Sequence, residues 1–215
     1  MNTTIKDFPK LECPFIREKN NKGEYLVTDK INPGYEWCFD NPDVIVEEKL
    51  HGTNVSIVIE NGVVISVFNR TERIPFINKG KRWIIEGILE SYSRGYMDLL
   101  PDGQHFGELI GEKVNGNPYN IKGHIWIPFN TYAKEHLKYN SWGKYPKDFK
   151  TISEWMEKNL MPLYYVKCNG LKLTPNGEYE GFVEGIIFVH PDGRLAKLRR
   201  DMFGWFKGFR HKERT

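Results

Sequence analysis

Lys49, His51 and Gly52 lie within one four-residue segment, Lys-Leu-His-Gly, which places a primary amine and an imidazole at a turn. A lysine amine that has lost its proton is a nucleophile and can form a covalent bond to a substrate. Glycine at the end of the segment permits a backbone conformation that is closed to other residues, as many tight turns require. By itself, a Lys-x-Asp/His-Gly pattern indicates only a turn with an exposed lysine, because it occurs by chance in about one in ten chains of this length.

Five further segments with charged or aromatic groups follow Lys49 in a fixed order. They are Asn69-Arg70-Thr71, Phe106-Gly107-Glu108-Leu109, Trp126-Ile127-Pro128-Phe129, Glu184-Gly185-Ile186-Ile187-Phe188 and Ala196-Lys197-Leu198-Arg199. The series, which spans about residues 44–200, resembles the covalent nucleotidyltransferases, the superfamily of ATP-dependent DNA and RNA ligases and mRNA capping enzymes. Within it, the stretch 47–54, with His51 in place of the commoner Asp, is most similar to the RNA ligase 2-like family of phages and RNA-editing ligases.

The resemblance assigns the covalent chemistry to Lys49, which in that family attacks the α-phosphate of ATP, forms a lysyl-AMP and releases pyrophosphate. A lysine amine with its ordinary pKa of about 10.4 is a poor nucleophile at neutral pH unless nearby cations or burial favour the neutral form. Lys197, Arg199 and Arg70 would supply those cations and stabilise charge on the α-phosphate. The predicted catalytic residues are therefore Lys49, Lys197 and Arg199. The predicted cofactors are ATP, as covalent AMP, and Mg²⁺, with Mn²⁺ as an alternative.

The other matched positions are expected to bind the nucleotide. Glu108 corresponds to a carboxylate that contacts the ribose hydroxyls, and Glu184 to one that binds the metal and the adenylate. Trp126 lies three residues before Phe129, where the family places an aromatic that stacks on adenine. Asn54 matches a position tied to nick sealing. The predicted nucleotide-binding residues are Glu48, Lys49, Leu50, His51, Asn54, Arg70, Glu108, Trp126, Glu184 and Lys197.

Three of these assignments have an alternative. For Trp126 the alternative is a buried strand residue that packs in the core. His51 can be a turn residue that is hydrogen-bonded to backbone. Glu180 begins a second Glu-Gly segment four residues before Glu184, and we prefer Glu184 because it leaves room for one hairpin before Lys197.

Alternating apolar and polar residues predict β-strands along much of the chain. Residues 44–70 are predicted to form a strand, a tight loop and a hairpin whose turn is Asn61-Gly62. Helical spacing predicts an amphipathic helix over 81–96, and a Thr-x-x-Glu capping box predicts a second helix over 151–160. The other predicted strands are 104–110, 124–132, 163–168, 182–189 and 194–199, and residues 134–150 are predicted to form a surface loop. This pattern indicates the α+β class, with antiparallel sheets flanked by helices. The resemblance implies the nucleotidyltransferase (ATP-grasp-like) domain of ATP-dependent ligases.

The 215 residues, with 13 Phe, 11 Tyr and 6 Trp, exclude a disordered or collagen-like chain. No apolar stretch approaches the roughly 20 residues that span a bilayer, and residues 1–10 show no signal or transit peptide. Three widely spaced cysteines argue against a disulfide framework.

We expect a single nucleotidyltransferase domain over 1–215, with its motifs in about 44–200, a tail at 201–215 and no accessory C-terminal domain. We expect a cytoplasmic protein, in the host cytoplasm if phage-encoded, with no membrane partner.

The segment 197–215 carries a formal charge of +5, and aromatic residues alternate with its cations. Such a mixture is typical of surfaces that neutralise phosphates and stack on bases, although a solvated terminus whose aromatics pack on the core has the same composition. The predicted nucleic-acid-binding residues are Lys207, Arg210 and Lys212, together with the lysines of the 134–150 loop. A partner protein could add further grip on the polynucleotide.

These features together predict an ATP-dependent RNA ligase that joins nicked or single-stranded RNA ends. The alternatives are a small DNA ligase or capping guanylyltransferase, a catalytically idle nucleic-acid-binding relative, and an enzyme that transfers AMP to a protein or small molecule.

Overall fold

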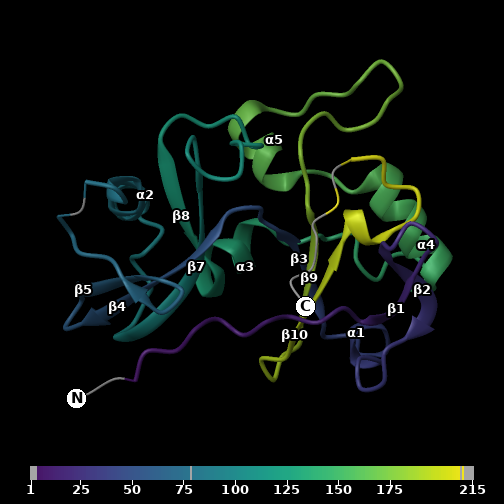
Figure 1. Cartoon of the computed structure of the whole chain (residues 1–215), viewed down its shortest axis with the longest axis horizontal. Helices are drawn as coiled ribbons and strands as arrows, with labels where there is room; N and C mark the ends of the chain where they lie inside the picture. The colour runs from purple at the N-terminus through teal and green to yellow at the C-terminus, as the bar shows by residue number, and fades with distance from the viewer. Residues whose placement is uncertain (1–3, 78, 209, 211–215) are drawn as a thin grey trace. The chain divides into compact units, whose positions relative to one another are not determined.

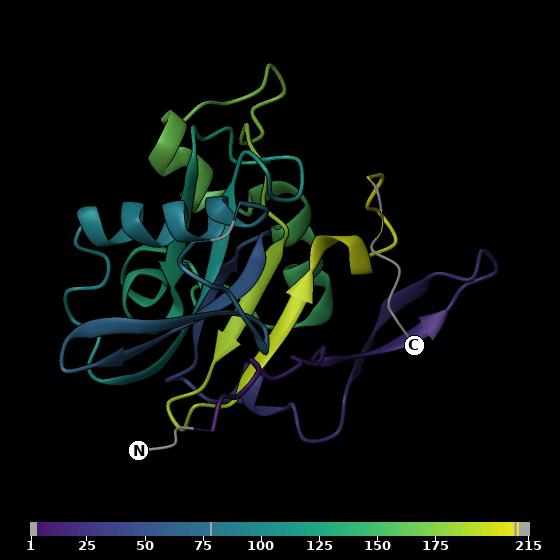
Figure 2. The same cartoon turned by 60° about the vertical axis from the view of Figure 1, so that its left-hand side comes forward.

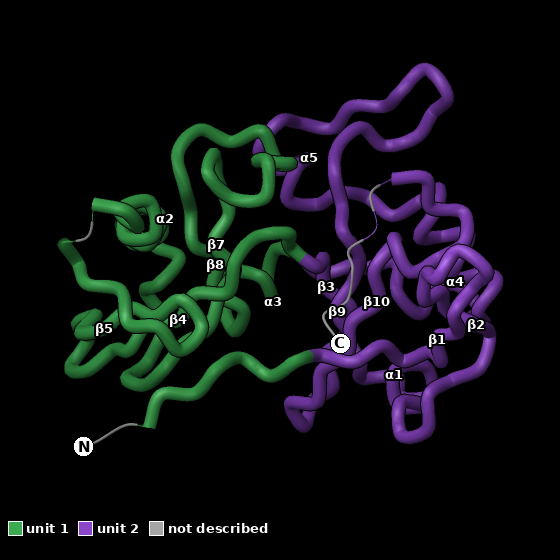
Figure 3. Tube along the Cα trace, viewed as in Figure 1, with its two compact units in different colours: residues 1–10, 50–137 green, residues 11–49, 138–215 purple. Residues whose placement is uncertain are grey.

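The computed structural model describes residues 4–77, 79–208 and 210, which form two compact units. Unit 1 comprises residues 1–10 and 50–137, and unit 2 comprises residues 11–49 and 138–215 (Figure 3). Each unit contains antiparallel sheet and helices, which confirms the α+β class. None of the described helices is long and apolar enough to cross a membrane. One domain over 1–215 stays a prediction.

Unit 1 is built on a five-stranded antiparallel sheet with the order β6-β5-β4-β7-β8 (Figure 1). Its strands are β4 (Thr53–Glu60), β5 (Val63–Asn69), β6 (Glu72–Arg73), β7 (Gly103–Gly111) and β8 (His124–Pro128). The predicted hairpin is confirmed, with Asn61 and Gly62 both in the left-handed region at φ 52° and 72°. The Asp102 carboxylate accepts hydrogen bonds from both turn N–H groups, at 2.8 and 3.0 Å.

Helix α2 (Arg82–Ser93) covers one face of this sheet and confirms the helix predicted over 81–96. Ile84 and Ile88 are buried in one hydrophobic cluster with Val55, Ile57 and Trp126. Burial of this apolar helix face against the strands holds unit 1 together.

The strand predicted over 124–132 is only half right. β8 ends at Pro128, which lacks an N–H and ends the ladder with Gly107. A π-helix (Phe129–Ala133) and the short helix α3 (Lys134–His136) follow. The predicted loop 134–150 therefore begins as a helix.

Unit 2 contains a three-stranded antiparallel sheet with the order β10-β9-β3 and a separate hairpin of β1 (Phe15–Lys19) and β2 (Tyr25–Ile31) (Figure 2). The three strands are β3 (Ile45–Lys49), β9 (Gly185–Val189) and β10 (Leu195–Arg199). One face of this sheet is buried, with Val46, Ile186, Phe188, Ala196 and Leu198 in the largest hydrophobic cluster.

The helices of unit 2 are α1 (Trp37–Asp40), α4 (Phe149–Glu154), a π-helix (Trp155–Asn159), α5 (Leu163–Asn169) and a 3₁₀-helix (Arg200–Met202). The second predicted helix is confirmed, but its cap is wrong: Asp148 Oδ1 accepts from the Thr151 N–H at 3.0 Å. The strand predicted over 163–168 is also wrong, since these residues form α5. Glu48 Oε2 accepts from the Tyr164 N–H at 2.8 Å and satisfies the first turn of this helix.

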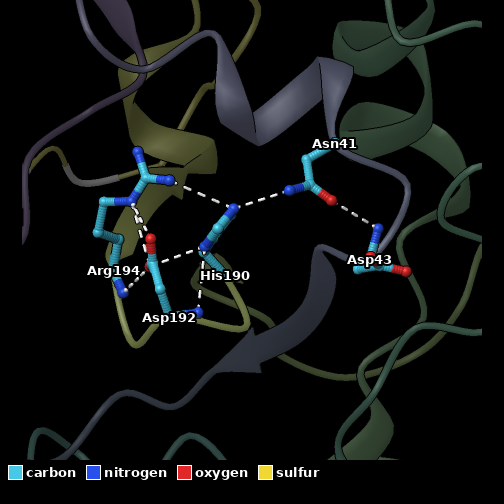
Figure 4. Close-up of polar contacts among 5 residues, drawn as sticks. All are labelled: Asn41, Asp43, His190, Asp192 and Arg194. Atoms are coloured by element: carbon cyan, nitrogen blue, oxygen red, sulfur yellow. Dashed lines mark hydrogen bonds and ion pairs between the residues drawn. The ribbon is translucent and has the colours of Figure 1, made fainter.

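The turn between β9 and β10 is tied to the segment after α1 by a polar network (Figure 4). His190 Nδ1 lies 2.7 Å from Asp192 Oδ1, and its Nε2 lies 2.8 Å from Asn41 Nδ2 and 3.3 Å from Arg194 Nη2. Asn41 Oδ1 in turn accepts from the Asp43 N–H at 2.8 Å. The Arg194 N–H bond to Asp192, more than any other interaction, lowers the pKa of that carboxyl. The network fixes the end of the sheet opposite to Lys49.

Candidate active site

The sheet of unit 2 places three predicted catalytic residues on one face. Lys49 on β3 and Arg199 on β10 both pair with Gly185 on the central strand, and Lys197 pairs with Ile187 two residues further along. Side chains directly across antiparallel strands share a face, and so do residues two apart on one strand. Lys49, Lys197 and Arg199 therefore lie on the face opposite to the hydrophobic core, and all three are partly exposed.

Glu184 forms an ion pair with Lys49. Its Oε2 atom lies 2.7 Å from Lys49 Nζ, and the two side chains are 8% and 22% exposed. Glu180 instead lies exposed in the preceding loop, where its N–H donates to the Lys172 carbonyl at 2.9 Å. The geometry thus favours Glu184 over Glu180 as the carboxylate beside Lys49.

Gly185 lets the strands carrying these groups approach closely. A Cβ atom added at Gly185 would lie 2.2 Å from the Leu198 carbonyl oxygen and 2.6 Å from Arg199 Cα. Any side chain at this position would push β10 away from β9. Glycine is therefore needed directly after Glu184, where the strands are closest.

Arg199 is oriented by a carboxylate that the sequence did not single out. Its Nε lies 3.0 Å from Asp201 Oδ1, with the side chains 13% and 6% exposed. An opposite charge at this distance attracts the guanidinium and favours its position beside Asp201. The one sequence feature that could have indicated this contact is the position of Asp201, two residues after Arg199.

Glu48 lies on the opposite face from Lys49, so the geometry contradicts the prediction that its side chain binds the nucleotide. It is 3% exposed beneath α5, and Oε1 has no hydrogen-bond partner among the described residues. Burial raises the pKa of Glu48 to about 8, so the carboxyl is protonated at neutral pH. Alternation of side chains along β3 is the reason for this correction.

In unit 1, the turn that follows Lys49 is held by three side chains. The His51 N–H donates to Tyr119 Oη at 2.7 Å, and the Gly52 N–H donates to Glu108 Oε1 at 2.8 Å. Asn115 Nδ2 donates to the Gly52 carbonyl at 2.8 Å. Sequence reasoning found Glu108 but missed Asn115 and Tyr119, which lie far along the chain with no recognised motif.

Gly52 is needed for space rather than for an unusual backbone conformation. Its φ is not positive, and an added Cβ would lie 2.3 Å from the Leu109 carbonyl oxygen. The expected reason for this glycine is therefore wrong: strand β7 passes too close for any side chain. Leu50, predicted to contact the nucleotide, is buried with 5% exposure.

Asn54 and Glu108 face each other across β4 and β7 of unit 1. The buried Oδ1 atom of Asn54 has no hydrogen-bond partner among the described residues, and both side chains are half-buried. Arg70 follows β5 with an exposed side chain and φ 56°. An amide oxygen and a carboxylate side by side can accept hydrogen bonds from a sugar's hydroxyls.

Trp126 packs in the core of unit 1 and does not share a face with Glu108. It is 0% exposed, its Nε1–H donates to the Val55 carbonyl at 3.0 Å, and a Cβ on Gly107 would lie 2.5 Å from its ring. Glu108 pairs instead with Ile127, one residue further along β8. The structure contradicts a stacking role for Trp126 and supports the alternative of core packing.

No group of three or more His, Cys, Asp or Glu side chains that could hold a metal occurs within residues 4–77, 79–208 and 210. Mg²⁺, however, is commonly bound by one or two carboxylates together with substrate phosphates. Glu184, whose Oε2 lies 2.7 Å from Lys49 Nζ, supplies one such carboxylate beside the proposed nucleophile.

The predicted nucleic-acid-binding residues differ in their surroundings. Lys207 is exposed. Arg210 is used within unit 2, since its Nε lies 3.1 Å from Glu24 Oε1 and its Nη1 donates to the Phe203 carbonyl at 2.9 Å. Lys212 lies outside the described residues. The structure thus argues against Arg210 as a free phosphate ligand.

A family model described as RNA ligase matches residues 42–207. No curated protein matches the chain in sequence. Among solved structures, a mutant Naegleria gruberi RNA ligase with AMP and Mn is similar, at 14% identity and a TM-score of 0.45 over 73% of this chain and 49% of that one. The Naegleria gruberi RNA ligase with PPi has 16% identity and a TM-score of 0.44 over 73% and 49% of the two chains. The present chain spans about half the length of these structures.

Proposed function

Because this chain belongs to the RNA ligase family over residues 42–207, we propose that it is an ATP-dependent RNA ligase that acts through a lysyl-AMP intermediate. One observation carries the proposal: Lys49 lies 2.7 Å from Glu184 on a sheet face that also bears Lys197 and Arg199. A nucleophile beside a proton acceptor, with two cations on the face of the nucleophile, matches what attack on a phosphate requires.

The first step joins Lys49 Nζ to the α-phosphorus of ATP as the bond to the bridging oxygen of pyrophosphate breaks. Lys49 attacks only as the neutral amine, so it must first lose a proton. Transfer of one proton to Glu184 Oε2, 2.7 Å away, frees the lone pair for attack. Lys197 and Arg199 stabilise the negative charge that develops on the phosphate, and Asp201 keeps Arg199 in place.

Glu184 is also the carboxylate that would hold Mg²⁺, or Mn²⁺ in its place. A bound divalent ion neutralises phosphate charge and orients the leaving group. In unit 1, Asn54 and Glu108 would accept hydrogen bonds from the ribose of the adenylate.

In the later steps, AMP passes from Lys49 to an RNA 5′-phosphate, and a 3′-hydroxyl displaces it to form the phosphodiester. Lys207 and the lysines of the 134–150 segment form the proposed contacts to RNA phosphates. Within that segment, the exposed lysines are Lys134, Lys138, Lys144 and Lys150. A partner protein could extend this grip. We propose that the protein acts in the cytoplasm and that its activity resides in one catalytic domain. Arg210 has a structural role in this proposal.

The test is a sealing assay on a nicked RNA duplex that carries a 5′-phosphate, with Mg²⁺ and either ATP or GTP. We expect sealing with ATP only. Glu184→Ala should abolish adduct formation and sealing, and the matched Glu180→Ala should not. Adduct formation with GTP alone would favour a capping enzyme, and binding of RNA without any adduct would favour an idle scaffold.

A further inference from the structure

The segment between β7 and β8 is an ordered loop built from residues that tolerate the left-handed conformation. Asn115, Asn117 and Asn120 have φ values of 47°, 51° and 50°. The Asn117 side chain closes the loop, donating to the Ile121 carbonyl at 2.9 Å and accepting from the Ile121 N–H at 3.2 Å. The loop therefore presents its side chains from a fixed backbone.

Two side chains of this loop contact the turn after Lys49. Tyr119 is fully buried, and its Oη accepts from the His51 N–H. Asn115 is exposed, and its Nδ2 donates to the Gly52 carbonyl. Neither residue belongs to a matched motif or to the steps described above.

We propose that Asn115 and Tyr119 are positioning residues that fix the turn next to Lys49 and so hold its amine in line with the α-phosphate; this inference rests on the proposed function. Lys49 pairs with Gly185 at the end of β3, and the next residues are held by the loop. The nucleophile is thereby held from both directions along the chain. Attack on phosphorus depends steeply on position, since a displacement of about 1 Å can lower a rate about 100-fold.

The test uses variants that each remove one side-chain group that holds the turn. Tyr119→Phe keeps the buried ring and removes Oη, and Asn115→Gly removes the amide while keeping a residue suited to positive φ. Tyr139→Phe is the matched control, because it removes another hydroxyl of a buried tyrosine, which donates to the Met161 carbonyl at 2.8 Å. Single-turnover lysyl-AMP formation is measured over a range of ATP concentrations, together with melting temperature and hydrogen exchange of the His51 amide.

We expect Tyr119→Phe to lower the maximal rate about tenfold, Asn115→Gly a few-fold, and both to leave the ATP concentration for half-maximal rate within twofold. The His51 amide should exchange faster in Tyr119→Phe, and Tyr139→Phe should adenylylate at the wild-type rate. Equal maximal rates in wild type and both variants would overturn the inference alone. An equal loss of rate in Tyr139→Phe would also overturn it, because removal of a buried hydroxyl away from the turn would then have the same effect. If wild type forms no adduct, the proposed function fails and the inference falls with it.

Discussion

Replacing Glu48 by glutamine should remove a pH dependence of stability that the buried carboxyl creates. Burial raises the pKa of Glu48 from 4.5 to about 8, against the hydrogen bonds from the Tyr164 and Leu163 backbone. Below pH 4.5 the folded and unfolded chains both hold this proton, and above about pH 8 both have lost it. Between these limits only the folded chain keeps the proton, so the free energy of unfolding falls as pH rises.

The size of this effect follows from one proton. The free energy of unfolding should fall by about 1.4 kcal/mol per pH unit within the interval, and by at most about 5 kcal/mol across it. In Glu48→Gln this contribution is absent, and the amide oxygen can still accept from the Tyr164 N–H. The stability of the variant relative to wild type should therefore rise steadily from pH 5 to pH 8.

Urea unfolding of both proteins at pH 5, 6, 7 and 8 measures the difference, in which the other titrating groups cancel. Glu154→Gln, at an exposed position on α4, is the matched control and should show no such rise. A difference for Glu48→Gln that does not change with pH would refute the protonated, buried carboxyl. Glu48→Gln should also form the lysyl-AMP at a rate within threefold of wild type. Loss of that step in a folded variant would restore Glu48 as a nucleotide contact.

Gly185→Ala should lower the free energy of unfolding by roughly 2 kcal/mol or more, measured by urea unfolding, because the Leu198 carbonyl leaves no room for Cβ; wild-type stability would contradict the close approach. Lys207→Glu should weaken RNA binding and flatten its salt dependence, whereas Arg210→Ala should lower the melting temperature and leave that dependence unchanged. Fluorescence anisotropy of labelled RNA over a salt series distinguishes the two variants. The reverse pattern would overturn the assignment of Lys207 to RNA binding and of Arg210 to structure. Trp126→Phe should lower the free energy of unfolding by about 1–3 kcal/mol and leave ATP affinity within twofold, as titration would show; lost affinity with intact stability would restore stacking.

The strands that carry the site were predictable because their patterns are local. Alternation in 44–70 and the hairpin before Lys197 determine which residues share a sheet face. Lys49 and Arg199 lie close together because they share one face. The resemblance added the order of the motifs, and the family match over residues 42–207 confirms the family.

The rest depends on contacts that no local pattern encodes. Helix α5 forms where a strand was predicted, and its first turn is hydrogen-bonded to Glu48, 116 positions away in the sequence. Trp126 has the same spacing whether it stacks on a base or packs beneath α2, and only the pairing with β7 distinguishes the two. In the sequence, Arg210 has the features of a phosphate ligand. In the structure, Glu24 and the Phe203 carbonyl bind its guanidinium.

The covalent bond to Lys49 is the central step of the proposed mechanism. The protein is incubated with Mg²⁺ and α-labelled ATP, and the labelled adduct is digested and mapped by mass spectrometry, with Lys49→Ala alongside. We expect one AMP, attached to Lys49 and absent from the variant. AMP on another residue, or no adduct in protein shown to be free of bound AMP, would contradict it.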